Sequence, residues 1–252
     1  MATPVLYHIE ISHYNEKARW ALDYKGIPHV RKAPPPMLHT AWAFAMTRTA
    51  TFPVLKLNGS TIGDSTRIIE ALERSHPEPA LYPADPDQRA AVEEAERWGH
   101  EVLQAPVRRI LWNTLKRDRA PLRSYAEGAK LGVPIGLAVK TAAPIVAAAA
   151  RMNSADDEVV RADLAALPAQ LQQVDDWIAD GVLGADPPNA ADLQIAASLR
   201  LAMTVDDLRP AIEERPAGQM ALRAIPDFPG HAPPVLPPAW LEPLRAKQGA
   251  SA

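Results

Sequence analysis

The chain of 252 residues contains no cysteine, which excludes disulfide bonds, cysteine-ligated metals and a nucleophilic protein thiol. Any sulfur chemistry must therefore use a thiol that is brought in from outside. The seven histidines form no pair at i and i+4 around an acid, and the sequence has no glycine-rich phosphate loop or nucleophile elbow. We therefore expect no metal site and neither nucleotide-dependent nor Ser-His-Asp chemistry.

The chain also lacks a strong excess of either charge. Its formal net charge is -3 with both signs interspersed, so no basic surface for nucleic acid is indicated. The first residues, Met-Ala-Thr-Pro, lack the basic start and apolar run of a secretory signal. We expect a cytoplasmic protein that binds no nucleic acid.

Residues 132–150 form the one apolar run that is long enough to raise the question of a membrane span. Lys140 lies in the middle of this run, Pro134 and Pro144 interrupt it, and alanine supplies much of its apolarity. These features predict a broken, buried helix pair rather than a membrane span.

Short strands and helices alternate in the first 76 residues. The residue pattern predicts strands at 5–9 and 29–32 around a helix from Glu16 to Tyr24, a loop with an irregular helix at 33–50 that includes three prolines, a hairpin at 53–62, and a helix capped by Asp64 or Ser65. Asn58-Gly59 readily supplies the positive φ angles of a tight I′ turn. The order βαβ-α-ββα with a parallel first pair is the thioredoxin-like arrangement.

Ser12 lies where the first strand gives way to the first helix. The N-terminus of a helix exposes unsatisfied backbone N–H groups and about half a positive charge, so a hydroxyl there is well placed to stabilise an anion such as a thiolate. Pro53 opens a strand that faces this helix N-terminus, where a cis Phe52–Pro53 bond would leave backbone groups free for a ligand. On base rates alone, a trans proline is the commoner case.

Three segments, Ser12–Leu22, Thr51–Leu55 and Gly63–Ile69, resemble in order and spacing the serine and cysteine branches of the glutathione transferase superfamily. The resemblance implies a thioredoxin-like α/β domain followed by an all-α domain. It also implies glutathione as the co-substrate.

By this resemblance, Ser12 takes the place of the catalytic serine or cysteine. The backbone of Phe52 beside a cis Pro53 would pair with the cysteinyl part of glutathione, while Asp64 and Ser65 would receive its γ-glutamyl end. The alternative for Asp64 and Ser65 is that they only cap their helix.

The sequence departs from the family pattern at His13, which replaces a proline. We expect His13 to face solvent in a loop. Redox relatives carry a second sulfur where Asn15 stands, so dithiol exchange is not expected. The catalytic tyrosine of the tyrosine branch falls on His8.

The rest of the chain reads as helical. We predict a thiol-binding domain at 1–76, a linker at 77–87, an all-helical substrate-pocket domain at 88–215 and a proline-rich tail without helix at 216–252. A long helix is expected from Gln88 to Gln104, and Asn189 to Asp192 resembles a capping box before a buried helix. Residues 120–153 match no family motif, and either an enlarged pocket wall or a packing insert fits them.

These observations predict a glutathione transferase-like enzyme of detoxification type, in which Ser12 activates the thiol of glutathione. The thiolate would attack a small apolar electrophile in a conjugation, an isomerisation or a thiolytic cleavage. The resemblance further implies a homodimer. Two alternatives stay open: a non-catalytic carrier of apolar ligands or protein-interaction module, and the same chemistry with a different low-molecular-weight thiol.

Overall fold

The computed structural model describes residues 3–9, 12–34, 39–49, 51–126 and 134–246. They form two compact units that meet in the sequence between Pro83 and Ala84. Parts of three predicted segments lie outside the described residues: 35–38 and 50 of the proline-containing loop, 127–133 of the stretch around the apolar run, and 247–252 of the tail.

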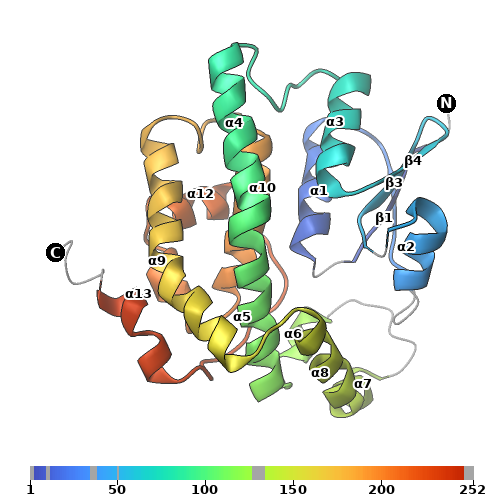
Figure 1. Ribbon diagram of the computed structural model, residues 1–252. Helices are drawn as coiled ribbons and strands as arrows, with labels where there is room; N and C mark the ends of the chain where they lie inside the picture. The colour runs from blue at the N-terminus through green and yellow to red at the C-terminus, as the bar shows by residue number, and fades with distance from the viewer. Residues whose placement is uncertain (1–2, 10–11, 35–38, 50, 127–133, 247–252) are drawn as a thin grey trace. The chain divides into compact units, whose positions relative to one another are not determined.

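The N-terminal unit has the predicted thioredoxin-like order. Its elements are β1 (Val5–Tyr7), α1 (His13–Tyr24), β2 (Val30–Lys32), α2 (His39–Thr47), β3 (Val54–Leu57), β4 (Ser60–Gly63) and α3 (Ser65–Ser75). The sheet order is β2-β1-β3-β4, with β1 parallel to β2 and the other pairs antiparallel. Helices α1 and α3 cover one face of the sheet, and α2 lies on the other face (Figure 1). The predicted fold class is therefore confirmed.

Local residue chemistry explains where these elements turn and begin. Asn58 and Gly59 both have positive φ, at 50° and 83°, as a I′ turn requires, and Leu57 pairs with Ser60 across it. Helix α1 begins at His13, three residues before the predicted start, and β1 ends at Tyr7 rather than Ile9.

The C-terminal unit is helical. Its elements are α4 (Pro86–Trp98), a π-helical turn η1 (Gly99–Leu103), α5 (Gln104–Arg117), α6 (Leu122–Tyr125), α7 (Ile135–Thr141), α8 (Ala143–Met152), α9 (Asp157–Ala179), α10 (Ala190–Met203), α11 (Arg209–Ile212), α12 (Pro216–Ala224), a 3₁₀ turn η2 (Pro238–Trp240) and α13 (Glu242–Ala246). Every residue of α10 is buried, so this helix forms the centre of the unit. At Gly99 a Cβ would lie 2.9 Å from side-chain carbons of Gln194 and Ile195, which explains how η1 packs closely on α10.

The prediction of a tail without helix is wrong at both of its ends: α12 occupies Pro216–Ala224 and packs against α10, and α13 occupies Glu242–Ala246. Pro216 is the first residue of α12, a position whose N–H has no partner within a helix, so proline is tolerated there. The proline-rich composition therefore sets where α12 begins instead of preventing it.

The apolar run does form a broken helix pair, with α7 and α8 bent by 59° relative to each other. The prediction that this pair is buried is wrong: α7 has no buried residue, and α8 buries Val146 and Ala150. Helix α8 packs one side against α5 and leaves its other side open. Among the described residues no single helix is long and apolar enough to cross a membrane, and only this bent pair meets that test when its helices are taken together.

Candidate functional site

The sheet register brings the three motif segments to one end of the N-terminal unit. Tyr7 of β1 lies opposite Val54 of β3, and Val54 lies opposite Gly63 of β4. These residues form one row across the sheet. Whatever follows Tyr7, precedes Val54 or follows Gly63 therefore leaves the sheet at the same end.

The predicted site residues occupy these three positions. The connection after Tyr7 leads to Ser12, Phe52 and Pro53 directly precede Val54, and Asp64 and Ser65 directly follow Gly63. The fold thus gathers segments that are up to 53 positions apart in the sequence (65 minus 12). Their roles toward a ligand stay predictions.

Ser12 is the N-cap residue of α1, with an extended backbone at φ -88° and ψ 118°. Its carbonyl oxygen accepts hydrogen bonds from the backbone N–H groups of Asn15 (2.9 Å) and Glu16 (3.0 Å). Its side chain makes no capping hydrogen bond. A serine at an N-cap usually accepts from the first-turn N–H groups, so the hydroxyl of Ser12 is not used for the most common structural purpose of such a residue.

Phe52 and Pro53 are buried, and the peptide bond between them is cis. Phe52 packs in a small apolar cluster with Ala43 of α2 and Val54 of β3. This packing holds the backbone before Pro53 at the end of the sheet where the Ser12 segment also emerges.

Asp64 caps α3 with one of its two carboxylate oxygens. Its Oδ1 accepts from the backbone N–H groups of Thr66 (2.9 Å) and Arg67 (3.2 Å), and no capping bond uses Oδ2. The residue is exposed and has a φ of 74°, which is uncommon for a non-glycine residue and costs on the order of 1 to 3 kcal/mol. The capping role of Asp64 is thus established, and its second oxygen is not used by the helix.

Ser65 opens α3 and is buried, yet its hydroxyl oxygen has no hydrogen-bond partner. Buried polar groups are paired in the great majority of cases, so each exception needs an explanation. This unpaired hydroxyl lies at a helix N-terminus, where anions are favoured. Ser65 therefore has the surroundings of a carboxylate-binding residue.

Lys17 and Arg19 were not found as candidate residues from the sequence. Lys17 is 1% exposed, and its Nζ donates to Thr66 Oγ1 over 3.1 Å, so it connects α1 to the first turn of α3. The available signal was that these two basic residues flank Ala18, within the apolar pattern of α1. Such a pair indicates charges that must be buried with partners.

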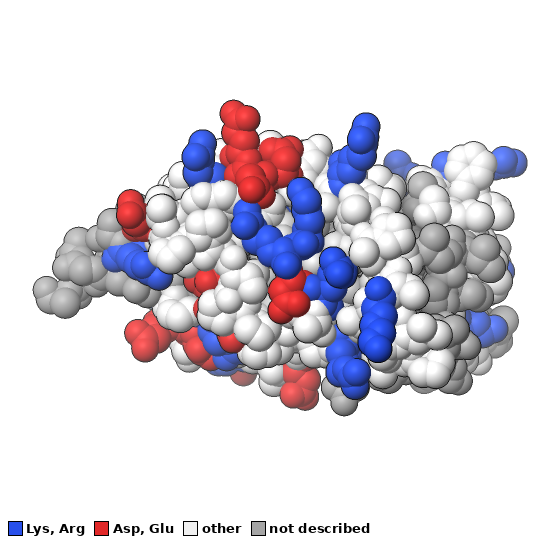
Figure 2. All heavy atoms as spheres, turned by 90° about the horizontal axis from the view of Figure 1, so that it is seen from below, with Lys and Arg blue, Asp and Glu red and all other residues white. Residues whose placement is uncertain are grey.

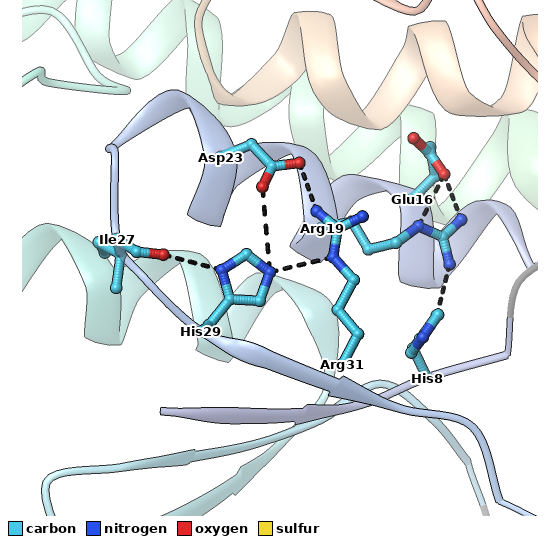
Figure 3. A network of polar contacts seen from close by, with 7 residues as sticks. All are labelled: His8, Glu16, Arg19, Asp23, Ile27, His29 and Arg31. Carbon is cyan, nitrogen blue, oxygen red and sulfur yellow. Dashed lines mark hydrogen bonds and ion pairs between the residues drawn. The ribbon is translucent and has the colours of Figure 1, made fainter. Parts of the chain in front are cut away.

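Arg19 fixes the strand-to-helix connection on both sides of Ser12 (Figure 3). Nη1 of Arg19 contacts His8 Nδ1 at 2.9 Å and donates to the carbonyl oxygen of Ile9 at 3.2 Å. Nε of Arg19 donates to Glu16 Oε2 at 2.9 Å. Burial, reinforced by the charge of Arg19, lowers the pKa of His8 to about 4. His8 is therefore a neutral hydrogen-bond acceptor at the position that aligned with the catalytic tyrosine.

The other contacts in Figure 3 connect β2 to the end of α1. Arg31 pairs with Asp23 and donates to His29 Nε2 at 3.0 Å, while His29 Nδ1 lies 2.8 Å from the carbonyl oxygen of Ile27. Asp23 is on the last turn of α1, so this group is well separated along the helix from Ser12. It stabilises the βαβ unit.

The first turn of α1 departs from prediction at His13. The expectation that His13 faces solvent is wrong, since it is buried as the first residue of the helix. Asn15, two residues further on, is fully buried, and neither its amide nitrogen nor its amide oxygen has a partner. Within the described residues, no group of three or more His, Asp or Glu side chains is arranged to hold a metal ion.

Comparison with known proteins matches residues 6–80 to the family "Glutathione S-transferase, N-terminal domain". A probable maleylacetoacetate isomerase 1 of Drosophila melanogaster is 37% identical over 98 residues, which is 36% of this chain and 39% of the relative. The maleylacetoacetate isomerase of Rattus norvegicus is 52% identical over 40 residues, or 16% and 18%. The matched stretches thus span well under two thirds of both relatives.

A solved glutathione S-transferase from Rhodospirillum rubrum F11 superposes with a TM-score of 0.57 at 21% identity, covering 96% of this chain and 99% of that one. Identity at this level shows the fold alone. The structural match extends over both units, whereas the match to the family model covers residues 6–80 of the N-terminal unit. Residues 6–80 thus match the family model of a glutathione S-transferase N-terminal domain, and the chain has the fold of a glutathione S-transferase.

Proposed function

We propose that this protein is a glutathione-dependent enzyme in which the hydroxyl of Ser12 donates a hydrogen bond to the sulfur of bound glutathione and so favours the thiolate. The observation that carries the proposal is the state of Ser12: it is the N-cap of α1, but its side chain does not cap the helix. The hydroxyl and the positive end of the α1 dipole would then face an anion together.

The magnitudes are sufficient for this role. A free thiol has a pKa of about 8.5, and lowering it by about two units requires roughly 2.7 kcal/mol of differential stabilisation. A hydrogen bond to a charged group contributes about 1.5 to 3 kcal/mol, and a helix terminus about 0.3 to 1 kcal/mol. One hydroxyl on a helix end therefore nearly accounts for the activation.

The γ-glutamyl end of glutathione would bind at the start of α3. The unpaired hydroxyl of Ser65 would donate to the ligand carboxylate, and Oδ2 of Asp64, which is not used for capping, would accept from the ligand ammonium. The backbone of Phe52 beside Pro53 would pair with the cysteinyl part. All three groups emerge at the end of the sheet defined by Tyr7, Val54 and Gly63.

Among the reactions open to such a thiolate, we favour isomerisation, because both matched relatives are named as maleylacetoacetate isomerases. The thiolate would add to one carbon of an activated C=C bond, and the electron pair would move onto the conjugated carbonyl oxygen. Rotation about the new single bond and expulsion of the thiolate would then restore the double bond in the other geometry. Glutathione would be regenerated in each turnover, whereas conjugation would consume one glutathione.

Ser12→Ala tests the assignment. We expect the glutathione-dependent rate at neutral pH to fall about 10- to 100-fold as the pKa of the bound thiol rises by one to two units, measured by ultraviolet absorbance of the thiolate. Ser75→Ala removes a hydroxyl that bonds to carbonyl oxygens of α3 and to the neighbouring His76, at the opposite end of α3 from the site, and should leave the rate unchanged. An unaltered rate in Ser12→Ala with several electrophiles, a cis-enedione among them, would refute the role of Ser12.

Calorimetry separates the remaining alternatives. Binding of glutathione at micromolar to low-millimolar concentration supports the enzyme, while no binding by any thiol in a panel supports a carrier of apolar ligands or a protein-interaction module. Binding of another thiol in place of glutathione would reassign the co-substrate. Sedimentation of the purified chain tests the expected homodimer, and fractionation tests the expected cytoplasmic location.

A further inference from the structure

The α7–α8 pair exposes large apolar side chains on the surface of the C-terminal unit. Leu137 is 52% exposed, Ile145 48% and Met152 83%. Single exposed apolar residues are ordinary on a protein surface, whereas a contiguous group of them marks an interaction surface. These three lie on two consecutive helices.

The two sides of α8 differ in character. Val146 and Ala150 are buried where α8 packs against α5. Ile145, Ala148 and Met152 follow at i, i+3 and i+7, all three exposed, so they share the opposite side of the helix. The open side is thus apolar by residue type and is separate from the side that stabilises the unit.

The charged side chains in the described part of residues 119–152 have one sign, while acidic residues flank this stretch at Asp118 and at Asp156 to Glu158. The described residues from Arg119 to Met152 include four basic side chains, all exposed, and no aspartate or glutamate: Arg119, Arg123, Lys140 and Arg151. The guanidinium of Arg123 lies beside α7, with one nitrogen 3.5 Å from where a Cβ on Gly136 would be. Figure 2 views the protein from below the view of Figure 1, and both lysine or arginine and aspartate or glutamate side chains reach the surface there.

The neighbouring basic residue Arg117 does not contribute to this excess. Its guanidinium pairs with Asp157 at 2.9 Å and stacks over the ring of Trp240. The four basic residues of the α7–α8 surface have no such carboxylate among the described residues between 119 and 152. All four side chains are exposed, so their charge is presented to solvent.

We propose that the α7–α8 pair is a docking surface for a membrane that contains anionic lipids. Leu137, Ile145 and Met152 insert at the boundary between headgroups and acyl chains, and the four basic side chains contact the headgroup phosphates. Apolar side chains with lysine and arginine at their margins are the composition of helices that lie in the plane of the interface. The opposite charge of the lipid surface complements the basic rim.

The same observations argue against a membrane span and against a protein partner. α8 has 10 residues, about 15 Å of helix, against a hydrocarbon core of about 30 Å, and the 59° bend prevents α7 from extending it. Protein interfaces are enriched in aromatic residues, yet residues 134–152 contain none. An aliphatic, alanine-rich surface without acids suits a lipid phase better.

Vesicle flotation of the full chain tests the proposal. We expect the protein to float with vesicles of phosphatidylcholine and phosphatidylglycerol, to remain free with phosphatidylcholine alone, and to lose binding as salt rises. Lys140→Glu with Arg151→Glu should lower the partition coefficient at least about tenfold. Arg97→Glu with Arg161→Glu makes the same change in net charge at two exposed positions elsewhere in the unit and should have a much smaller effect.

Apolar insertion has its own matched pair of variants. Ile145→Glu with Met152→Glu should abolish flotation, while Val102→Glu, at an exposed apolar residue of η1, should not. Circular dichroism and glutathione binding of each variant check that the fold is kept. The proposal is overturned if the wild-type chain does not float with anionic vesicles. The same holds if the α7–α8 variants float as well as their control variants. It is also overturned if the α7–α8 variants abolish only self-association in sedimentation, since a second copy would then cover this surface.

Discussion

Helices α1 and α10 begin with similar polar residues, but the side chains of these residues form capping hydrogen bonds only in α10. Each helix has a polar N-cap residue with extended backbone and a polar residue three positions later: Ser12 and Asn15 in α1, Asn189 and Asp192 in α10. In α10 the two side chains satisfy each other's backbone N–H groups as a capping box. In α1 the serine makes no cap bond, and the buried amide of Asn15 has no partner.

The difference separates polar groups that stabilise the fold from polar groups that are kept for a ligand. Asp192 accepts from the backbone N–H groups of Gly184 (2.7 Å) and Asn189 (2.9 Å), and Asn189 donates to the carbonyl oxygen of Val182 at 2.8 Å. The polar side chains of Asn189 and Asp192 at the start of α10 are therefore all used in hydrogen bonds within the fold. At the start of α1 the unpaired groups cost stability, and a site that binds an anion is where such a cost is expected.

The largest effect on stability should come from Asp192→Ala. This change leaves the partly buried backbone N–H groups of Gly184 and Asn189 without acceptors, and we expect the free energy of unfolding to fall by about 3 kcal/mol in urea titration. Asp156→Ala is the matched control, because Asp156 caps α9 from an exposed position with a single bond to Val159. It should cost about 1 kcal/mol or less, and equal costs for the two variants would contradict the comparison.

The start of α3 lies between these extremes, because Asp64 both caps the helix and keeps one oxygen unused. Asp64→Ala removes two capping bonds and places an alanine at a φ of 74°, so we expect a loss of about 2 kcal/mol. Asp64→Asn keeps the capping oxygen and tolerates this φ, and should cost about 0.5 kcal/mol. If the proposed function is right, the KM for glutathione rises in both variants, since both lose the charge that would meet the ligand ammonium.

Acid should destabilise the connection before α1 through His8. Its pKa is about 4 in the folded protein and about 6.5 when unfolded, so below pH 6.5 the unfolded chain takes up the proton first. The free energy of unfolding should therefore fall between pH 6.5 and pH 4, by on the order of 1 to 2 kcal/mol after allowing for solvent screening. His8→Asn keeps an acceptor for Arg19 but does not titrate, and its stability curve should be flatter in this window. An unchanged slope would show that other groups dominate it.

The sequence was most informative where the chemistry is local. The Asn58-Gly59 turn and the Asn189 capping box depend on residues within a few positions of one another, and both are confirmed. The position of Ser12 at a helix start followed from the change of periodicity nearby, although α1 begins three residues earlier than predicted.

Most of the failed predictions depend on packing between distant residues. Whether His13 is buried, and whether α8 is covered by other helices, is decided by elements far away in the chain. The contact of Lys17 with Thr66 spans 49 positions and has no local signature. The proline content predicted no helix at 216–224, but proline is tolerated at the first position of a helix, and Pro216 opens α12.

The smallest effect on stability should come from the residue with the largest proposed effect on chemistry. A serine N-cap that bonds to the first turn costs about 1 kcal/mol when replaced by alanine. Since Ser12 makes no such bond, Ser12→Ala should change the free energy of unfolding by less than about 0.5 kcal/mol, measured by urea titration without thiol. A loss of 1 kcal/mol or more would mean that the hydroxyl caps α1 in solution. It would then have to break that bond before it could donate to a thiolate, and the contrast between the two helix starts would disappear with it.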